Sequence, residues 1–257
     1  MARHIEAWMD GTRLGGIGAI VIDDVTEQAA EVEITYGIRV FRSGQPVLKR
    51  RRKSLKVTIS GKIHELYDLK KRAAVRQAIA AWCNGDVLQL SNHPGQQLHV
   101  ICRAEPGLGA VRDFNSLLDI ELEADSIPYW EDIIPNSVSS SGTTGSASLL
   151  IAGTADEIPV EVSFAPGSTL TSLTVTIVCG GVTKSIALSG MSITSGTIVF
   201  GRDSEDRLTI KNGDTSLMRY RSAASADDLI VPAGKATVSW TADVSGSITF
   251  SAKGRWL

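Results

Sequence analysis

The chain has 257 residues, 43% of them hydrophobic and 21% charged, a composition typical of a folded protein that excludes an intrinsically disordered one. Its 26 basic and 28 acidic residues nearly cancel, so net charge gives no support to a nucleic-acid-binding or membrane-surface protein. The odd number of cysteines, Cys83, Cys102 and Cys179, argues against a disulfide framework and fits assembly in a reducing compartment.

The start of the chain lacks the apolar core of a signal peptide. No apolar run in the sequence approaches the length that a membrane-spanning helix needs. We therefore expect a soluble protein that is made in the cytoplasm.

A long hairpin is predicted early in the chain. Residues 31–41 alternate between apolar and polar side chains, Ser43–Pro46 form a turn signal, and a second strand runs from Val47 to Ile59. The second strand carries the basic run Lys49–Lys53, which could contact phosphates. No aromatic residues are interleaved to stack on bases, so we favour an extended arm that is solvated or contacts another subunit.

One helix is predicted, from about His64 to Cys83, because Ser60-Gly61 breaks the preceding strand and Asn84-Gly85 offers a left-handed cap. Its apolar residues fall on two sides. Leu66, Leu69 and Ala73 lie nearly opposite Val75, Ile79 and Trp82. A helix that is apolar on two sides needs two partners, which we expect to be its own sheet and a neighbouring subunit.

A second hairpin and an acidic strand follow the helix. Val87–Leu90 and Leu98–Cys102 flank the turn signal Asn92–Gly95. Residues 113–124 are predicted to form a strand with one buried face, because leucine and isoleucine at 118, 120 and 122 alternate with acidic residues at 119, 121 and 123. We expect these elements to complete an α+β domain over residues 1–135.

Residues 136–148 are almost entirely serine, threonine and glycine, and this composition predicts a flexible linker. Residues 149–257 read as about eight short strands with no helix signal, which predicts a β-sandwich. Two tight hairpins are expected there, at Gly180-Gly181 and at Asn212-Gly213. The fold class is therefore mainly β, with the single helix in the first domain.

No catalytic, cofactor-binding or metal-binding motif is recognisable, so we expect neither an enzyme nor a cofactor. His93, His99 and Cys102, together with Cys83, loosely suggest zinc, but their spacing favours ordinary turn and core residues. The acidic run 203–206 is interpreted as a turn rather than a calcium loop. A carbohydrate-binding module remains an alternative, although the second domain's few aromatic residues suit its core equally well.

Three stretches resemble the distal tail protein family of long, flexible-tailed bacteriophages and related prophages. They are Val57–Ile63 with the helix and hairpin that follow it, the acidic strand that ends in Asp125–Trp130, and the C-terminal Gly254–Leu257. The resemblance implies an N-terminal tail-tube-like β-sandwich and long hairpin with one helix, forming a ring, usually a hexamer. It also implies a C-terminal galectin-like β-sandwich.

The resemblance further implies a place at the virion tail tip, reached by assembly in the bacterial cytoplasm. Its expected partners are copies of itself, the tail tube protein, a tail-associated hub or tip protein, and receptor-binding proteins. DNA would pass through the ring without specific binding, and no membrane contact is implied. Another tail ring protein, of the tube or terminator type, is the remaining alternative. The residues that we expect in the ring interface are Arg51, Arg52, Val75, Ile79 and Trp82.

Overall fold

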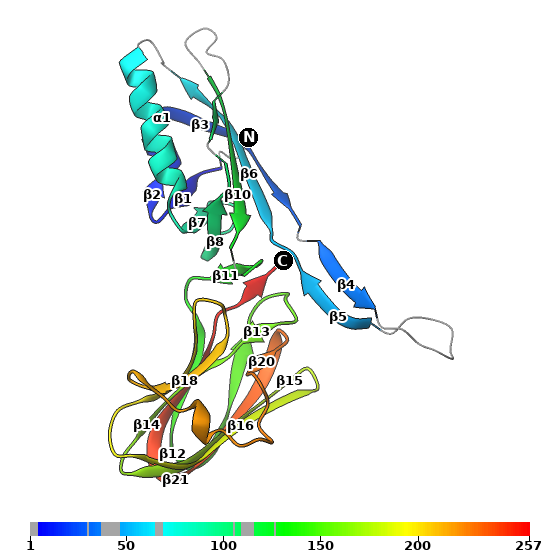
Figure 1. Ribbon diagram of the computed structural model, residues 1–257, viewed down its shortest axis with the longest axis vertical. Helices are drawn as coiled ribbons and strands as arrows, with labels where there is room; N and C mark the ends of the chain where they lie inside the picture. The colour runs from blue at the N-terminus through cyan, green and yellow to red at the C-terminus, as the bar shows by residue number, and fades with distance from the viewer. Residues whose placement is uncertain are drawn as a thin grey trace, which may run out of the picture. The chain divides into compact units, whose positions relative to one another are not determined.

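The computed structural model describes residues 5–29, 31–36, 47–64, 69–104, 106–108, 116–125 and 127–257. The chain divides into two compact units, Met1–Trp130 and Glu131–Leu257, so the division falls a few residues before the predicted one at 135. The prediction of a mainly β protein is confirmed (Figure 1). None of the helices among the described residues has the length and apolar character needed to cross a membrane.

Unit 1 is built on one antiparallel sheet with the strand order β2-β1-β7-β8-β10-β6-β3, and β9 pairs beside β10. The strands are β1 (Ala7–Met9), β2 (Thr12–Arg13), β3 (Ala19–Gln28), β6 (Lys56–His64), β7 (Val87–Leu90), β8 (Gln96–Cys102), β9 (Gly107–Leu108) and β10 (Ser116–Ala124). A short 3-10 helix, Leu14–Gly16, joins β2 to β3. The predicted hairpin of β7 and β8 is confirmed, and so is the alternating burial of β10.

Ser60-Gly61 does not break the strand as predicted, because β6 runs through both residues as far as His64. Gly61 lies between Leu118 of β10 and Ile22 of β3. A Cβ atom at position 61 would lie 2.5 Å from the backbone oxygen of Val21. The glycine therefore serves the close approach of β3, next to the bulge in that strand between Ile22 and Asp24.

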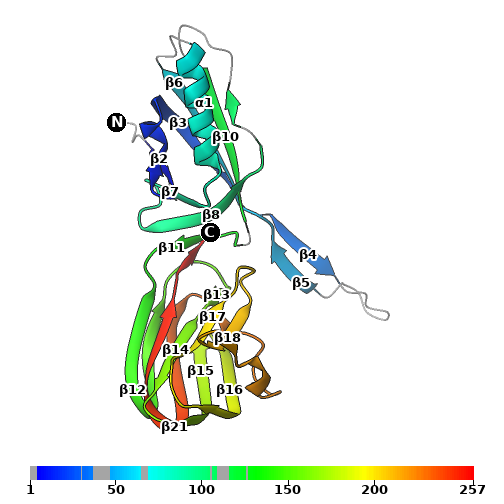
Figure 2. The same cartoon turned by 60° about the vertical axis from the view of Figure 1, so that its left-hand side comes forward.

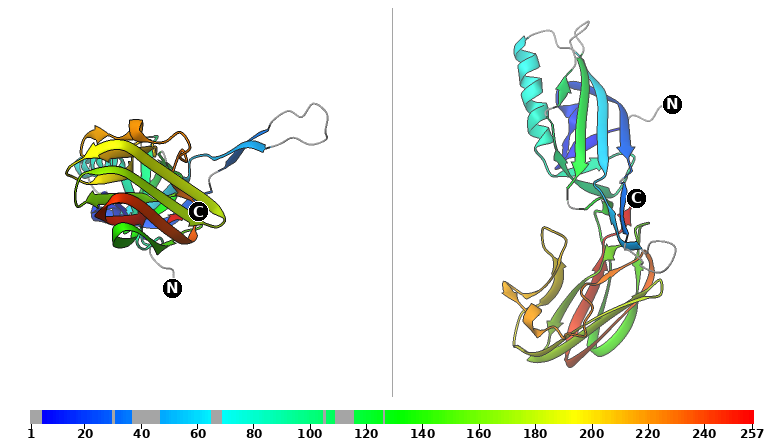
Figure 3. Two further views of the ribbon diagram at one scale, coloured as in Figure 1. Left: turned by 90° about the horizontal axis from the view of Figure 1, so that it is seen from below. Right: turned by 45° about the vertical axis from the view of Figure 1, so that its right-hand side comes forward.

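The helix α1 (Leu69–Cys83) lies beside this sheet (Figures 2 and 3). Its predicted start at His64 is wrong, because His64 belongs to β6; residues 65–68 lie outside the described part of the chain. The predicted left-handed cap is also wrong, since neither Asn84 nor Gly85 has a positive φ. A Cβ atom at Gly85 would lie 2.4 Å from side-chain atoms of Met9 and Asp10, so close packing accounts for this glycine.

The predicted long hairpin is present as the pair β4 (Val32–Tyr36) and β5 (Val47–Arg52). The strands are antiparallel, with Glu33 opposite Arg51, and they pair with each other and with no other described strand. In the figures they form a separate two-stranded ribbon (Figure 3). The predicted turn at Ser43–Pro46 lies outside the described residues. We call β4 and β5 the arm.

Unit 2 contains no linker where one was predicted, because residues 136–148 belong to the strand β12 (Asn136–Ile151). β12 pairs along its whole length with β21 (Gly234–Ala252). Serine and threonine tolerate the extended conformation, and the partner strand supplies the backbone hydrogen bonds that the composition alone does not reveal. β11 (Trp130–Asp132) carries the chain into this unit.

The sheet of unit 2 folds over at β21. The first half of β21 pairs with β15 (Leu170–Cys179) and its second half pairs with β14 (Glu161–Pro166). β12 is bulged at Gly142/Thr144, where these partners change. The full order is β16-β15-β21-β14-β17-β18-β19, with β12 on the other side of β21 (Figure 2). The remaining elements are β13 (Ile158–Pro159), β16 (Val182–Ile193), β17 (Ile198–Arg202), β18 (Leu208–Asn212), β19 (Thr215–Ser216), the 3-10 helix Met218–Tyr220, β20 (Ile230–Val231) and β22 (Arg255–Trp256).

Both tight hairpins predicted for unit 2 are confirmed. Gly180 and Gly181 both have positive φ between β15 and β16, as a two-residue primed turn requires. Asn212 pairs with Thr215 across Gly213, which also has positive φ. The core between the two halves of the sheet is filled by large buried side chains, among them Phe164, Phe200, Trp240 and Phe250.

Candidate interaction surfaces

The arm carries both charge and exposed apolar area. Ile34 and Tyr36 are 39% and 51% exposed on β4. β5 and the residue after it carry Lys49–Lys53, against two glutamates at 31 and 33. A two-stranded ribbon is marginally stable alone, and its outer edges leave backbone groups unpaired. The arm therefore has the character of a surface that becomes stable against a partner.

An ion pair holds the base of the arm. Lys53 Nζ lies 2.8 Å from Glu31 Oε2, and the Lys53 amide donates to the Glu31 carbonyl over 2.8 Å. The hydrogen bond and the charge of Lys53 lower the pKa of Glu31, and the same contact raises the pKa of Lys53. Both groups are well exposed, so this pair fixes the register of the strands more than it stabilises them.

The face of β3, β6 and β10 that points away from the buried residues is acidic. Asp24 lies on β3, and Asp119, Glu121 and Glu123 alternate along β10. Ser60 of β6 donates a hydrogen bond of 2.7 Å to Asp119. Two basic residues, Lys56 and Lys62, and Arg103 beside Glu123 offset part of this charge. We call Asp24, Asp119, Glu121 and Glu123 the acidic face.

The structure places the three helix residues predicted for the ring interface in the core of unit 1. Ile79 is fully buried, Val75 is nearly so, and Trp82 is 4% exposed and donates from Nε1 to the Thr12 carbonyl over 2.7 Å. On the other predicted apolar side, Ala73 is exposed, whereas Leu66 and the side chain of Leu69 lie outside the described part of the structure. The charged neighbours Lys70 and Arg76 were the signal that this other side is polar.

The two predicted arginines lie apart from that cluster, on β5. Arg52 is half-buried, and the side chain of Arg51 lies outside the described part of the structure. The five residues therefore do not form one patch. Val75, Ile79 and Trp82 pack inside their own unit.

A hydrogen-bonded cluster that the sequence did not indicate joins β3, the β7–β8 turn and the end of unit 1. The Glu27 carboxylate lies 2.7 Å from His93 Nε2 and accepts a 2.9 Å hydrogen bond from Trp130 Nε1. The His93 ring stacks on Trp130 with centroids 4.1 Å apart, and its Nδ1 lies 3.1 Å from the Gln96 side chain.

Glu27 and His93 each shift the pKa of the other in the direction that favours its charged form. The hydrogen bond from His93 to Glu27 raises the pKa of His93 against the opposing effect of burial. Burial would raise the pKa of Glu27, but hydrogen bonds from His93 and Trp130 and the histidine charge lower it overall. His93 and Glu27 form an ion pair when the imidazole is protonated. Among the described residues, no group of three or more His, Cys, Asp or Glu side chains is placed to hold a metal ion.

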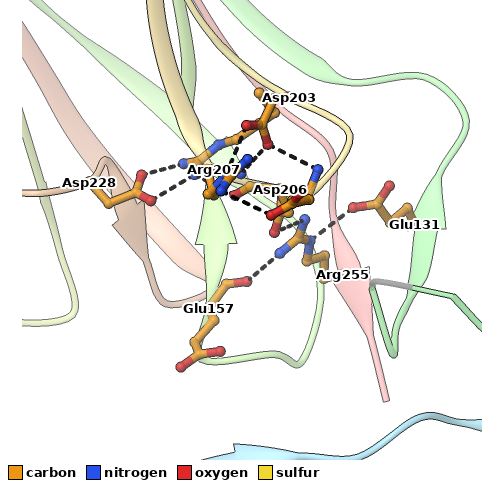
Figure 4. A network of polar contacts seen from close by, with 9 residues as sticks. Glu131, Glu157, Asp203, Asp206, Arg207, Asp228 and Arg255 are labelled. Atoms are coloured by element: carbon orange, nitrogen blue, oxygen red, sulfur yellow. Dashed lines mark hydrogen bonds and ion pairs between the residues drawn. The ribbon is translucent and has the colours of Figure 1, made fainter. Parts of the chain in front are cut away.

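Unit 2 contains a second cluster, centred on a buried arginine (Figure 4). Arg255 is 3% exposed and donates to Glu131 over 2.8 Å, to Asp206 over 3.0 Å and to the Glu157 carbonyl over 3.3 Å. Beside it, Arg202 forms a two-pronged pair with Asp228 and also donates to the Asp206 carbonyl. The cluster joins the first and last segments of unit 2 to the 203–206 turn.

The charged groups of the arginine cluster are paired with each other, so the arrangement fastens chain segments. The aromatic residues that a carbohydrate site would use are mostly in the core, with Trp240 and the three phenylalanines buried. Tyr220 is partly exposed with Arg219 over its ring, and Trp256 donates to Asp132 over 2.8 Å.

Comparisons with known proteins agree on the fold. No family model and no curated protein matches the sequence. The crystal structure of the phage SPP1 protein Dit (gp 19.1), described as a paradigm of the hub adsorption apparatus in phages that infect Gram-positive bacteria, is similar with a TM-score of 0.70 and 12% identity. It covers 97% of this chain and 98% of that one.

A chain of the phage p2 baseplate in its activated, strontium-bound conformation is similar with a TM-score of 0.51 and 11% identity, over 98% of both chains. The alignments cover nearly the whole sequence, so they include both units. The β-rich fold expected from the resemblance is confirmed. The chain therefore has the fold of a phage distal tail protein.

Proposed function

We propose that this chain is a structural subunit of a phage tail tip, where it joins the tail tube to the adsorption apparatus. One observation carries the proposal: the similarity to the SPP1 protein extends over 97% of the chain, through both units in the same order. A tube or terminator subunit is the alternative. Electron microscopy of particles labelled with an antibody to unit 2 separates these roles, because our proposal requires label at the tip only.

The role rests on a ring of identical subunits, which we propose to be a hexamer formed by unit 1. A contact between two different faces of one domain generates a closed ring when the rotation per subunit is right. The arm supports this proposal, because it is a basic ribbon with unpaired edges and exposed apolar side chains. We propose that the arm of each subunit binds its neighbour in the ring.

The acidic face of unit 1 suits a water-filled channel. A face that carries Asp24, Asp119 and Glu121 is unsuited to burial in an apolar interface. Carboxylates also repel phosphates, so a channel lined by them lets DNA pass without binding it. We propose that this face lines the channel of the ring.

The proposed ring meets the tail tube protein and a hub protein. The galectin-like unit 2 contacts receptor-binding proteins. The assembled protein belongs to the virion and is put together in the host cytoplasm.

Reversal of the arm's charge tests the ring. In Arg50→Glu/Arg51→Glu/Arg52→Glu, the arm would carry four acidic residues and one lysine, so its contact with a neighbour should be lost. Analytical ultracentrifugation of the wild-type protein should show a closed oligomer, and the triple variant should sediment as a folded monomer.

The matched control is Lys211→Glu/Lys235→Glu, which changes exposed lysines of unit 2 and should leave the oligomer intact. If the arm variant keeps the wild-type oligomer, the arm is not the ring contact. If the control dissociates as well, general electrostatics governs assembly and the arm has no special role.

A further inference from the structure

The carboxylate of Glu27 joins two parts of unit 1 that are far apart in sequence. Its Oε1 atom lies 2.7 Å from His93 Nε2 and 3.4 Å from Asn92 Nδ2, both in the turn between β7 and β8. Its Oε2 atom accepts the 2.9 Å hydrogen bond from Trp130 Nε1. One carboxylate therefore holds the turn and the tryptophan together, with a separate oxygen for each.

Both ring nitrogens of His93 face acceptor oxygens. Nε2 faces Glu27, and Nδ1 lies 3.1 Å from Gln96 Oε1. A neutral imidazole carries one N–H group, whereas the imidazolium ion carries two. The protonated ring can therefore donate to both oxygens, and a neutral ring can donate to only one of them.

The same imidazole ring covers one face of Trp130. The two rings are stacked with centroids 4.1 Å apart and planes 8° apart, and Trp130 is 1% exposed. A cation over an indole face is attracted by the π electrons of the ring. Trp130 is thus held at its face by His93 and at its N–H group by Glu27, and the two holds together are strongest when both partners are charged.

Trp130 occupies a distinct place in the chain. It is the last residue of unit 1 and the first residue of β11, a strand that pairs with β8 and β22. The side chain that His93 and Glu27 hold therefore anchors the start of this strand.

We propose that His93 is a proton-operated latch on Trp130. The protonated ring holds the indole and the start of β11 in place, and loss of the proton lets this segment open more often while the rest of unit 1 stays folded. The proposal stands on the contacts of the three side chains and does not depend on the tail function.

The elements around the β7–β8 turn carry other titratable groups, which are Glu6 before β1, Lys56 on β6, Asp86 before β7, His99 on β8 and Asp125 after β10. Glu6 binds Ser91 through its backbone, and its carboxylate is paired with Arg13. The charged group that acts on His93 is Glu27, on β3.

The pH range of the latch follows from these contacts. The hydrogen bond to Glu27 raises the pKa of His93, burial opposes this effect in part, and the charge of Glu27 adds to it. The latch is therefore closed at about pH 6.5 and opens as the pH rises through the raised pKa of His93. Glu27 keeps its charge over this range because its own pKa is lowered.

Hydrogen exchange of the full-length protein, measured by mass spectrometry and corrected for the intrinsic pH dependence of exchange, tests the latch. Between about pH 6 and pH 8.5, protection of a peptide covering residues 127–132 should fall several-fold, with a midpoint above about pH 6.5. A peptide covering residues 79–85, at the end of α1, is the internal reference. Its protection should stay constant, since Trp82 donates to a backbone carbonyl that does not titrate.

Three variants make the result specific. His93→Gln keeps an amide donor but no charge, so the 127–132 peptide should exchange at both pH values as the wild-type peptide does at high pH. Glu27→Gln removes the carboxylate and should also abolish the pH step. His99→Gln should keep it, and circular dichroism at each pH confirms that each variant is folded.

Three results would overturn the proposal. One is equal protection of the wild-type 127–132 peptide at the two pH values. The second is a pH step that persists in His93→Gln. The third is an equal loss of protection in the α1 peptide, which would mean that unit 1 loosens as a whole and that His93 acts as no local latch.

Discussion

The two units place their charges in opposite ways. Unit 1 has a basic arm that pairs with no other described strand, and it has an acidic sheet face. Unit 2 buries its central arginine with its acidic partners, and its longest strand, β21, has partners on both sides. This difference supports the proposal that unit 1 carries the contacts between subunits of the ring.

Trp82→Asp is the change with the largest expected effect on this comparison. It removes a large buried side chain and its hydrogen bond to Thr12, and it places a charge in the core of unit 1. We expect a loss of about 5 kcal/mol from the free energy of unfolding of unit 1, measured by urea denaturation. The matched control is Ala81→Asp, on the exposed side of the same helix, which should cost less than about 1 kcal/mol. A folded but monomeric Trp82→Asp protein would instead return Trp82 to the ring interface.

Arg255→Met tests the closed network of unit 2. The substitution leaves Glu131 buried without its charged partner, so we expect a loss of about 3–5 kcal/mol from the free energy of unfolding of unit 2. Arg221→Met is the control, because its partner Asp227 is fully exposed, and its ion pair should contribute less than about 1 kcal/mol. Equal losses of unfolding free energy in the two variants would mean that the buried network stabilises unit 2 no more than an exposed ion pair does.

Gly61→Ala tests the contact between β3 and β6. The new Cβ atom would collide with the backbone of β3, which cannot move aside cheaply, so we expect a loss of about 1–3 kcal/mol in unit 1. Gly16→Ala is the control, because nothing lies within 4 Å of its Cβ position, and its stability should be unchanged or slightly higher. Hydrogen exchange of the β3 amides should rise in Gly61→Ala alone; unchanged protection would contradict the close contact.

The smallest expected effect is the pH dependence of the Glu27–His93 pair. The raised pKa of His93 gives a stabilisation that is complete below about pH 6.5 and is lost as pH rises through the raised value. The lowered pKa of Glu27 also stabilises the folded state. This stabilisation is present above about pH 4.5 and is lost as the pH falls through the lowered pKa of Glu27. The Glu27–His93 pair should therefore add most to the stability of unit 1 between about pH 4.5 and pH 6.5.

Thermal unfolding of His93→Gln against pH measures this contribution. The variant should lose the alkaline decline that the wild-type protein shows above about pH 6.5. His99→Gln, on β8, controls for the removal of a histidine elsewhere in the unit. Parallel profiles for the wild-type and His93→Gln proteins would show that the pair does not affect stability.

Local patterns in the sequence predicted the local structure. The hairpins at Gly180-Gly181 and Asn212-Gly213 follow from turn chemistry, and the acidic strand follows from strict alternation. β12 was missed because its serine and threonine residues become a strand only through pairing with β21, about a hundred residues later in the chain. Composition cannot reveal such a distant partner.

The candidate surfaces show the same limit. The basic run predicted the arm, since charge and alternation are visible in the sequence itself. The burial of Val75, Ile79 and Trp82 depends on which side of α1 meets the sheet, and helical periodicity left two sides open. The Glu27–His93–Trp130 cluster joins residues that are far apart in sequence, and no spacing pattern indicated it.

We propose that the protein acts through its shape, repeated around the axis of a ring. Native mass spectrometry of the full-length protein at low salt measures this directly. Our account predicts a closed assembly of six chains that the triple arm variant cannot form. A wild-type protein that stays monomeric at all concentrations, also in the presence of its tail tube protein, would contradict the account.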